Sequence, residues 1–409
     1  MTAPTAPTAE RVERAKWGLR ATFFFMGVAV AATSARFAEI KGHTHTSDAI
    51  FGYCIMVGNL GSIFGNIFGS RLSRKIGTRR TAQIIMFGVA GSQIAYGFVN
   101  KIWEIPLVAF VAGASYALTN IACNAQGSMI QESVGRSLMP SFHGSWSIGA
   151  CTASFLAGFI AKYVPVEWHL LGNSLVALFG TLAVSRALLP YSADHHDTVK
   201  NFEVPHNLPI PREIKNFIWM VAIGSFLATI AETSVGDWSS IYLKEDLRIP
   251  IGINTLGYTC FVLAQIVGRF SVGRWIDKYG IPLVIRVGGL LGGFGYLIGL
   301  IVANIERAHH QYTALVIMCV AYAILGFGVA PMPPSYVSVA GSIPGIPTAR
   351  ALTRLALIAS TGFFIGRFTI SSLAGLFGLP SALLFPATAL IGSGVLAHFL
   401  DIKRIKTPA

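Results

Sequence analysis

The stretch GRFSVGRWIDKYGIP at residues 268–282 lies between two long apolar segments and decides how the chain folds. A related basic turn, GSRLSRKIGTRR, occupies residues 69–80, about 203 residues earlier, and also follows a long apolar segment. The similarity extends back along both segments, because FGY at residues 51–53 matches LGY at residues 256–258. A repeat of this kind predicts a chain built from two related halves. The alternative is chance similarity between two basic turns.

The composition is typical of a membrane protein. Hydrophobic residues make up 53% of the chain and charged residues only 12%, with a mean hydropathy of +0.60. Charged residues are about 25% of a soluble domain. The net charge of +13 would suit nucleic acid, but the basic residues lie in short loops beside apolar segments, which indicates membrane topology. We therefore expect a lipid bilayer as partner and no nucleic acid. The five cysteines lie in apolar segments without metal-site spacing, so we predict no metal and no cofactor.

Twelve apolar segments are long enough to cross the hydrocarbon core, which takes about 20 residues for ~30 Å. We predict helices, because lipid offers no hydrogen-bond partner to an unpaired backbone and a barrel would show alternating apolarity. The first segment also has features of a cleavable secretory signal, but we predict an uncleaved span because many more spans follow. The predicted spans are residues 17–40, 50–71, 80–99, 104–130, 140–162, 166–189, 215–243, 252–274, 281–304, 311–338, 349–374 and 378–400.

The placement of Lys and Arg predicts the orientation. If the N-terminus is cytoplasmic, 22 of the 31 basic residues fall on the cytoplasmic side and six on the other. This bias predicts a plasma-membrane protein with both termini inside. The predicted parts are a cytoplasmic tail at 1–16, an N-terminal six-helix half at 17–189, a cytoplasmic linker at 190–214, a C-terminal six-helix half at 215–400 and a cytoplasmic tail at 401–409.

This organisation resembles the major facilitator superfamily of secondary transporters, which has twelve spans in two halves of six and a glycine-acid-base-glycine turn after the second span of each half. The resemblance implies an all-α membrane protein with two pseudo-symmetric halves that works by alternating access on a small-molecule substrate. It implies neither an enzyme nor an oligomer, so we expect a monomer. The residues that match the signature turn are Gly273, Arg274, Asp277, Lys278 and Gly280.

The first-half copy of this turn departs from the family pattern. With Gly77 aligned to Gly280, Arg74 stands where the acid should be. In the family that acid helps to latch the cytoplasmic gate. The resemblance therefore predicts a gate held mainly by the second half, with Asp277 as a buried acid and Arg74 as the lesser contributor.

Three further stretches resemble uncharacterised bacterial inner-membrane facilitators related to the fucose-proton symporters. They are NIACNAQG at 120–127, MPSFHGSWSIGA at 139–150 and AETSVGDW at 231–238. Two acids that the fucose permease uses are absent, because Asn120 and Arg36 occupy their places. The substrate and the coupling route of that permease therefore do not carry over.

One face of the predicted fourth span is polar. At 100° per residue, its members fall within about ±40° of one another. A surface of amides suits a polyhydroxylated substrate, whereas small residues and amides also hold membrane helices together; the family's placement of its fourth span at the cavity favours binding. Gln126 points about 120° away and is expected to contribute little. The members of this face are Gly113, Tyr116, Asn120, Asn124, Gly127 and Gln131.

The predicted seventh span carries a polar stripe with Glu232 near its middle. An acid at the centre of a membrane helix costs about 2.5 to 3.5 kcal/mol and is a functional candidate. We predict that Glu232 couples transport to a proton, with sodium as the alternative ion. Asp237 is a second candidate, nearer the outer surface and the edge of the stripe, where a wetted or helix-end role is expected. The alternative for Glu232 is a structural ion pair with Arg36 or Arg367. The stripe comprises Ser225, Thr229, Glu232, Thr233, Gly236, Asp237, Ser239 and Ser240.

The remaining candidates are weaker. His143 and Trp146 are candidates for a cavity wall, with ordinary packing or capping as the alternative. Arg36 and Arg367 are candidates for holding an anionic group, whereas Arg367 can also snorkel outward. Prolines at 331, 333 and 334 predict a break in the tenth span.

Together these features predict a transporter that moves a small, polar, sugar-like solute together with protons. The alternatives within transport are efflux of amphipathic compounds and transport of an organic anion. From a different class, the alternatives are a non-transporting membrane sensor and a polytopic membrane enzyme.

Overall fold

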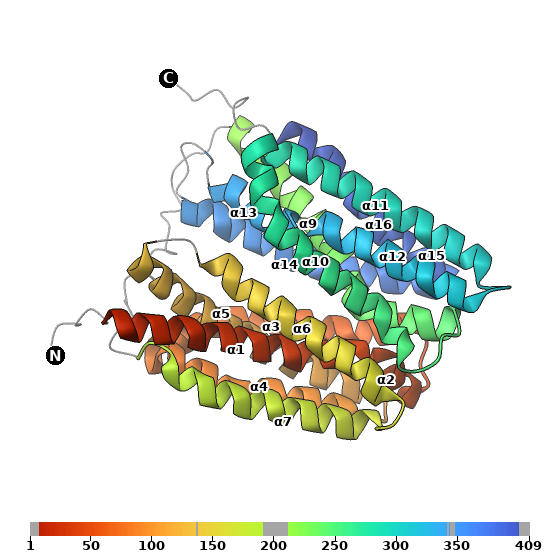
Figure 1. Ribbon diagram of the computed structural model, residues 1–409, viewed down its shortest axis with the longest axis horizontal. Helices are drawn as coiled ribbons and strands as arrows, with labels where there is room; N and C mark the ends of the chain where they lie inside the picture. Colours follow the sequence, from red (N-terminus) through yellow and green to blue (C-terminus); the bar gives the residue numbers. More distant parts are fainter. Residues whose placement is uncertain (1–7, 136–137, 191–211, 342, 344–347, 401–409) are drawn as a thin grey trace. The chain divides into compact units, whose positions relative to one another are not determined.

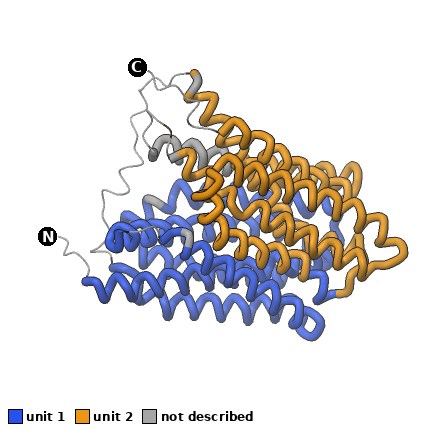
Figure 2. Tube along the Cα trace, turned by 45° about the horizontal axis from the view of Figure 1, so that its top comes forward, with its two compact units in different colours: residues 1–199, 251–255 blue, residues 200–250, 256–409 orange. Residues whose placement is uncertain are grey.

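The computed structural model describes residues 8–135, 138–190, 212–341, 343 and 348–400. Its contacts divide the chain into two compact units (Figure 2). Unit 1 comprises Met1–Val199 with Ile251–Thr255, and unit 2 comprises Lys200–Pro250 with Leu256–Ala409. All the regular elements within the described ranges are helical (Figure 1). Most of the predicted linker at 190–214 and the predicted tail at 401–409 lie outside the described residues.

Unit 1 contains the first six predicted spans. The first span is bent at Arg36, where a long helix ends and a short one begins. The short 3-10 helix η4 (Ile253–Thr255) also belongs to this unit, where it packs against α6. The helices are α1 (Ala9–Ala35), α2 (Phe37–Thr44), α3 (Asp48–Ile76), α4 (Thr78–Gly97), α5 (Glu104–Val134), α6 (Met139–Ala161), α7 (Val166–Val184) and η1 (Ser185–Ala187).

Unit 2 contains the last six. The seventh span ends in a π-helical turn, and the tenth span is interrupted as predicted. Pro331 lies at the break, and the two later prolines fall in the first turn of α13, where a missing N–H costs no helical bond. The helices are α9 (Arg212–Ile241), η3 (Tyr242–Asp246), α10 (Leu256–Tyr279), α11 (Ile281–Glu306), α12 (Gln311–Val329), α13 (Met332–Gly341), α14 (Thr348–Phe377), α15 (Leu379–Ala382), α16 (Leu384–Leu396) and η5 (Ala397–Phe399).

A helix occupies each of the twelve predicted positions. Among the residues that the structure describes, ten helices are long and apolar enough to cross a membrane, and Thr361–Phe377 is a shorter apolar helix. The helix α4 is outside this set, since Thr81, Ser92 and Gln93 are polar yet buried in unit 1. The first helix begins at Ala9, inside the predicted tail, because Thr8 caps it. The all-α membrane fold with two six-helix halves is confirmed.

Close approach of helix backbones holds unit 1 together. A Cβ atom added at Gly113 of α5 would lie 1.9 Å from the carbonyl oxygen of Gly58 on α3, and one at Gly27 of α1 would lie 2.1 Å from the carbonyl oxygen of Trp146 on α6. Lipid tails are as apolar as side chains, so membrane helices associate by such packing of small residues. These crossings fix α5 and α6 beside α3 and α1.

The two aligned basic turns share one backbone conformation. Gly77 has φ 88° and ψ 151° between α3 and α4, and Gly280 has φ 79° and ψ 157° between α10 and α11. This region is open to glycine almost alone. The agreement at aligned positions favours the predicted duplication over chance similarity.

Candidate functional site

Glu232 on α9 pairs with α10. Its Oε1 atom accepts a hydrogen bond from Nε2 of Gln265 at 2.7 Å and one from Nη2 of Arg269 at 3.1 Å. The two donors lie one turn apart on α10, so they share a face of that helix. The side chains of Glu232 and Arg269 are 27% and 22% exposed, respectively. The charge partner of Glu232 is therefore Arg269, in place of Arg36 or Arg367, which the sequence offered as an alternative.

Asp237 on α9 pairs instead with α14. Arg367 donates from Nε to Oδ2 at 2.6 Å and from Nη2 to Oδ1 at 2.9 Å, which is the strong bidentate geometry. Asp237 is buried, so the predicted wetted position is wrong. Arg367 is likewise half-buried in an ion pair rather than snorkelling outward.

The two acids of α9 therefore form ion pairs with different helices. Five residues separate them, which corresponds to about 140° around the helix at ~100° per residue. Glu232 points at α10 and Asp237 at α14. The polar stripe of the seventh span thus divides between two helix interfaces.

The polar face of α5 is also divided. Gln131 caps the next helix, because its Oε1 accepts from the backbone N–H of Leu138 at 2.9 Å. Gly113 and Gly127 are packing positions, the latter facing Met139 of α6. Helix packing and capping therefore explain the residues at both ends of this face. They do not explain the residues at its centre.

The centre holds Tyr116, Asn120 and Asn124, all half-buried. Nδ2 of Asn124 donates to Oδ1 of Asn120 at 2.6 Å. Oδ1 of Asn124 is buried and has no hydrogen-bond partner among the described residues. Tyr116 packs against an apolar cluster that includes Phe23 and Cys123. The structure thus leaves an amide acceptor without a partner where the sequence predicts substrate contact.

The predicted residues of α6 adjoin the same cluster. His143 is exposed at the edge of the Phe23 ring, with centroids 5.2 Å apart. Trp146 packs against the cluster, and its Nε1 atom is buried without a hydrogen-bond partner in the described part of the chain. Buried polar atoms are nearly always hydrogen-bonded. Nε1 of Trp146 on α6 and Oδ1 of Asn124 on α5 are therefore a donor and an acceptor that a polar ligand could satisfy.

Arg36 is a structural residue of unit 1. It is only 1% exposed. Its guanidinium donates to Nδ1 of His169 at 3.0 Å and to the carbonyl oxygen of Val164 at 3.0 Å, and it forms an ion pair with Glu39. Arginine cannot accept a hydrogen bond, so Nδ1 of His169 is the acceptor. These contacts tie the bend of the first span to α7 and contradict the prediction that Arg36 binds substrate.

Gln126 does more than the sequence predicts. Its Nε2 donates to Oγ1 of Thr78 at 2.7 Å and to the carbonyl oxygen of Leu189 at 2.9 Å, and its Oε1 accepts from the N–H of Leu189 at 2.9 Å. The side chain is completely buried. The expectation that Gln126 contributes little to substrate binding stays a prediction. Its structural role was not expected, because a helical-wheel angle gives the direction of a side chain and not its partners.

Replacing Gln126 with Ala should destabilise the protein. The change removes the side-chain partner of the N–H and carbonyl groups of Leu189, at about 1 to 3 kcal/mol for each buried group left unsatisfied. We expect a clearly lower melting temperature in detergent, with the apparent substrate affinity of the folded fraction preserved. A melting temperature equal to that of the parent would show that water replaces these bonds.

The signature turn lies at the end of α10. Asp277 is exposed and makes no ion pair with any side chain that the structure describes, so its predicted burial is wrong. Lys278 places its ammonium group 5.0 Å from the centroid of the Tyr279 ring. A Cβ atom added at Gly273 would meet nothing within 4 Å. At Gly273 this turn is therefore open with respect to the residues that the structure describes.

Comparison with known proteins decides the family. The sequence model of the Major Facilitator Superfamily matches residues 18–257 and 221–408. The chain belongs to the Major Facilitator Superfamily. Within this superfamily, an uncharacterized transporter of Sinorhizobium fredii, y4wD, is 27% identical over 360 residues, covering 87% of this chain and 90% of its own length.

Solved structures of other transporters share the fold. The nucleoside transporter NupG matches with a TM-score of 0.68 at 12% identity, covering 97% of this chain and all of its own. A D-xylose-proton symporter matches with a TM-score of 0.71 at 14% identity, covering 94% of this chain and 97% of its own. Because the chain belongs to the Major Facilitator Superfamily, the protein is a multi-pass membrane protein and a secondary transporter, not an enzyme. The finer resemblance to fucose-proton symporters stays a prediction.

Sequence reasoning missed Arg269 and Gln265 as members of the site of this facilitator. A signal was present, since both are polar, lie inside a predicted span and are four residues apart. An arginine and an amide on one helical face predict an acidic partner. The sequence does not show how α10 is rotated about its axis, and this rotation turns the face that carries Gln265 and Arg269 toward α9.

Proposed function

We propose that this facilitator is a proton-coupled symporter of a small, polar, sugar-like solute in a bacterial inner membrane, with both termini cytoplasmic. The observation that carries the proposal is the contact of Glu232 with Arg269 and Gln265 between two membrane helices. In this contact the carboxylate of Glu232 forms a charge pair with Arg269 that protonation would weaken.

The chemistry of the pair fits a proton better than sodium. Protonation neutralises the carboxylate of Glu232 and weakens its attraction to Arg269, so a bound proton changes how α9 is held to α10. A sodium ion at Glu232 would face a guanidinium whose Nη2 lies 3.1 Å from the carboxylate oxygen, and like charges repel at that range. Because both side chains are partly exposed, water can solvate them when the pair opens.

Asp237 fits a structural role rather than a coupling role. Its carboxylate is buried and bound at both oxygens by Arg367. Protonating it would remove the charge that the half-buried guanidinium of Arg367 pairs with, and breaking a buried pair from one side is strongly unfavourable. We assign this pair to the attachment of α9 to α14.

The substrate class follows from the unpartnered polar atoms of unit 1. Trp146 offers an N–H donor and Asn124 a carbonyl acceptor, and both are uncharged. A hydroxyl group can accept from one and donate to the other. The names of the solved neighbours state a nucleoside and D-xylose with a proton as cargo, in line with such a solute. The organic-anion alternative loses its support because Arg36 and Arg367 are already paired with acids.

The gate is assigned to the two basic turns. Gly77 and Gly280 give both turns the same sharp backbone path, and Asp277 is the acid that only the second turn carries. Its exposure leaves Asp277 available to a basic partner in one state of the transport cycle. Arg74 takes the equivalent place in the first turn.

Uptake into proteoliposomes tests the proposed function. A panel of labelled pentoses, hexoses and nucleosides is offered with and without an inward proton gradient, and organic anions and amphipathic cations serve as the comparison set. The proposal predicts saturable uptake of a polyhydroxylated solute that the gradient accelerates. Transport of charged or amphipathic compounds alone would overturn the substrate class, and indifference to the gradient would overturn the coupling.

Removing the polar atoms of α5 and α6 should weaken substrate binding. We expect Asn124→Ala and Trp146→Phe each to lower apparent affinity about ten- to hundredfold, since an unsatisfied group costs about 1 to 3 kcal/mol. The matched control is Asn173→Ala, whose amide already donates to the carbonyl oxygen of Val28 at 3.1 Å. Equal loss of affinity at all three positions would instead assign the α5 and α6 groups to helix packing.

A further inference from the structure

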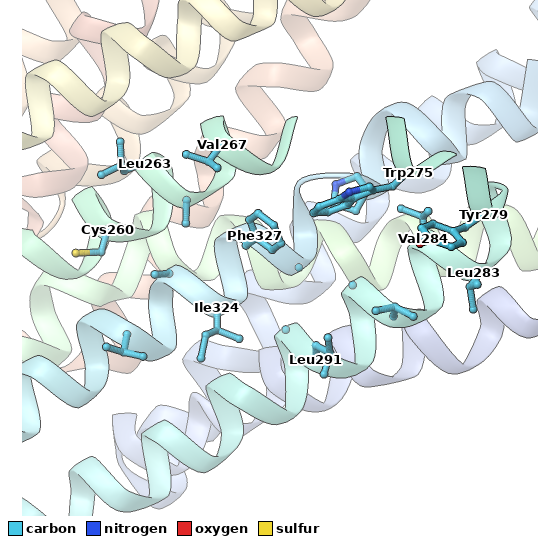
Figure 3. A pocket seen from close by; sticks show the side chains of 18 residues that line it. Cys260, Leu263, Val267, Trp275, Tyr279, Leu283, Val284, Leu291, Ile324 and Phe327 are labelled. Atoms are coloured by element: carbon cyan, nitrogen blue, oxygen red, sulfur yellow. The ribbon is translucent and has the colours of Figure 1, made fainter. Parts of the chain in front are cut away.

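An apolar groove runs along the outside of unit 2 between α10 and α11, with α12 beneath it (Figure 3). Its volume is about 920 Å³, near the upper end of the roughly 300 to 1,000 Å³ of small-molecule pockets. Its walls include Val267 of α10, Leu291 of α11 and Phe327 of α12. Val267 and Leu291 are more than half exposed. The groove therefore opens on the surface that faces lipid.

Helix packing explains why the groove exists. The helix α12 packs closely against both neighbours, whereas α10 and α11 contact each other sparsely. A Cβ atom added at Gly288 would lie 2.5 Å from the carbonyl oxygen of Gly328, and one at Gly268 would lie 2.6 Å from Cβ of Ala330. Gly288, Gly292 and Gly328 line the groove, so part of its lining is helix backbone without side chains.

The groove is long enough to hold acyl chains. Its lining runs from Cys260 to Tyr279 on α10, from Leu283 to Gly292 on α11, and from Val320 of α12 to Pro331, just past the end of that helix. At ~1.5 Å per residue these distances are roughly 28, 14 and 17 Å. The hydrocarbon core of a bilayer is about 30 Å thick, so the groove spans at least the acyl chains of one leaflet.

One end of the groove is aromatic and basic. Trp275 and Tyr279 line this end (Figure 3), and such residues lie at the membrane-water interface. Three exposed cations lie within a few residues of this end in the sequence: Lys278, whose ammonium group lies over the Tyr279 ring at 5.0 Å, with Arg274 and Arg286. The acid of the same turn is Asp277, so the three cations outnumber it and this end is positive.

We propose that the groove seats the acyl chains of an anionic phospholipid, whose phosphate binds Arg274, Lys278 and Arg286. The apolar lining and the positive end together favour this occupant, because basic residues beside a membrane helix attract anionic headgroups. A second copy of this chain, with its net charge of +13, would bring like charge toward the same basic end.

Quenching of Trp275 by brominated lipid tests the proposal. The full-length protein is placed in mixed micelles with brominated phosphatidylglycerol or brominated phosphatidylcholine. Of the seven tryptophans, the contribution of Trp275 is isolated by subtracting the signal of Trp275→Phe. We expect phosphatidylglycerol to quench Trp275 at a much lower mole fraction than phosphatidylcholine.

Charge and groove variants sharpen the test. Neutralising Lys278 and Arg286 together to Gln should weaken quenching by phosphatidylglycerol about thirtyfold, at ~1 kcal/mol per cation. The charge control is Arg212→Gln with Lys215→Gln, two exposed cations at the start of α9. Filling the groove with Leu291→Phe should reduce quenching by both lipids. Its control, Ile298→Phe, lies on α11 outside the groove and is equally exposed to lipid.

Four results would overturn the proposal. Equal quenching by the two lipids would remove the headgroup preference, and an equal effect of the α9 charge pair would make the attraction non-specific. Absence of quenching by either lipid would show that acyl chains do not enter the groove. Light scattering gives the fourth: if Leu291→Phe converts a dimer to a monomer, the groove is a contact between copies.

Discussion

Replacing Glu232 with Gln is expected to abolish accumulation of substrate against a concentration gradient while sparing counterflow between equal pools. The amide mimics the protonated acid, so it keeps a hydrogen-bond partner for Gln265 but cannot release a proton. It also removes the counter-ion of Arg269, which the structure places 3.1 Å from the carboxylate. The measurement is uptake into proteoliposomes across a series of imposed pH gradients, together with counterflow at equal pH.

Two control variants separate coupling from structure. Glu306→Gln changes an acid at the end of α11 and should leave both uptake and counterflow intact. If Glu232 only holds Arg269 in place, the double variant Glu232→Gln with Arg269→Gln should recover uphill transport, because no unpaired charge remains. If Glu232 carries the proton, the double variant stays unable to accumulate substrate. Uphill transport retained by Glu232→Gln alone, with unchanged pH dependence, would exclude the coupling role.

Replacing Asp237 with Asn is expected to damage folding rather than coupling. The substitution leaves the guanidinium of Arg367 in a half-buried site without its counter-ion, and breaking a buried pair from one side costs about 3 to 5 kcal/mol. We expect a low yield of folded protein and a much lower melting temperature in detergent. The folded fraction should keep the pH dependence of uptake seen in the parent.

The double variant Asp237→Asn with Arg367→Gln tests the origin of that loss. Neutral partners of similar shape restore hydrogen bonding without charge, and replacing both members of a buried pair is often nearly neutral. We expect it to recover most of the melting temperature. A double variant as unstable as Asp237→Asn alone would show that Arg367 has a separate role, and a changed pH profile in the single variant would move the coupling group to Asp237.

The membrane fold is predictable because lipid imposes it locally. Each span must satisfy its own backbone hydrogen bonds, so apolar length alone locates a helix, and all twelve positions agree with the structure. The duplication is readable for a similar reason. Gly77 and Gly280 adopt a conformation that other residues avoid, so each turn requires a glycine that can be recognised in the sequence.

The partners of the polar side chains are not predictable in the same way. The sequence gives the direction of Glu232 on its own helix, but its partner depends on how far α10 is rotated about its axis. The same limit explains Gln126, whose three bonds depend on where α4 begins and the sixth span ends. It also explains Arg36, whose partners His169 and Val164 lie at the start of α7 and just before it. Rotations of this kind are set by packing between helices distant in sequence.

The partners that surround Arg36 in the folded protein are synthesised at different times. Glu39, only three residues away, can neutralise Arg36 as soon as the first span leaves the ribosome. His169 and Val164 follow 133 and 128 residues later, which at ~5 to 20 residues per second is roughly 7 to 27 seconds of synthesis. Throughout that interval the first span depends on its local acid alone to carry an arginine in the membrane. We therefore expect replacement of Glu39 to lower the yield of inserted protein, and not only the activity of the finished transporter.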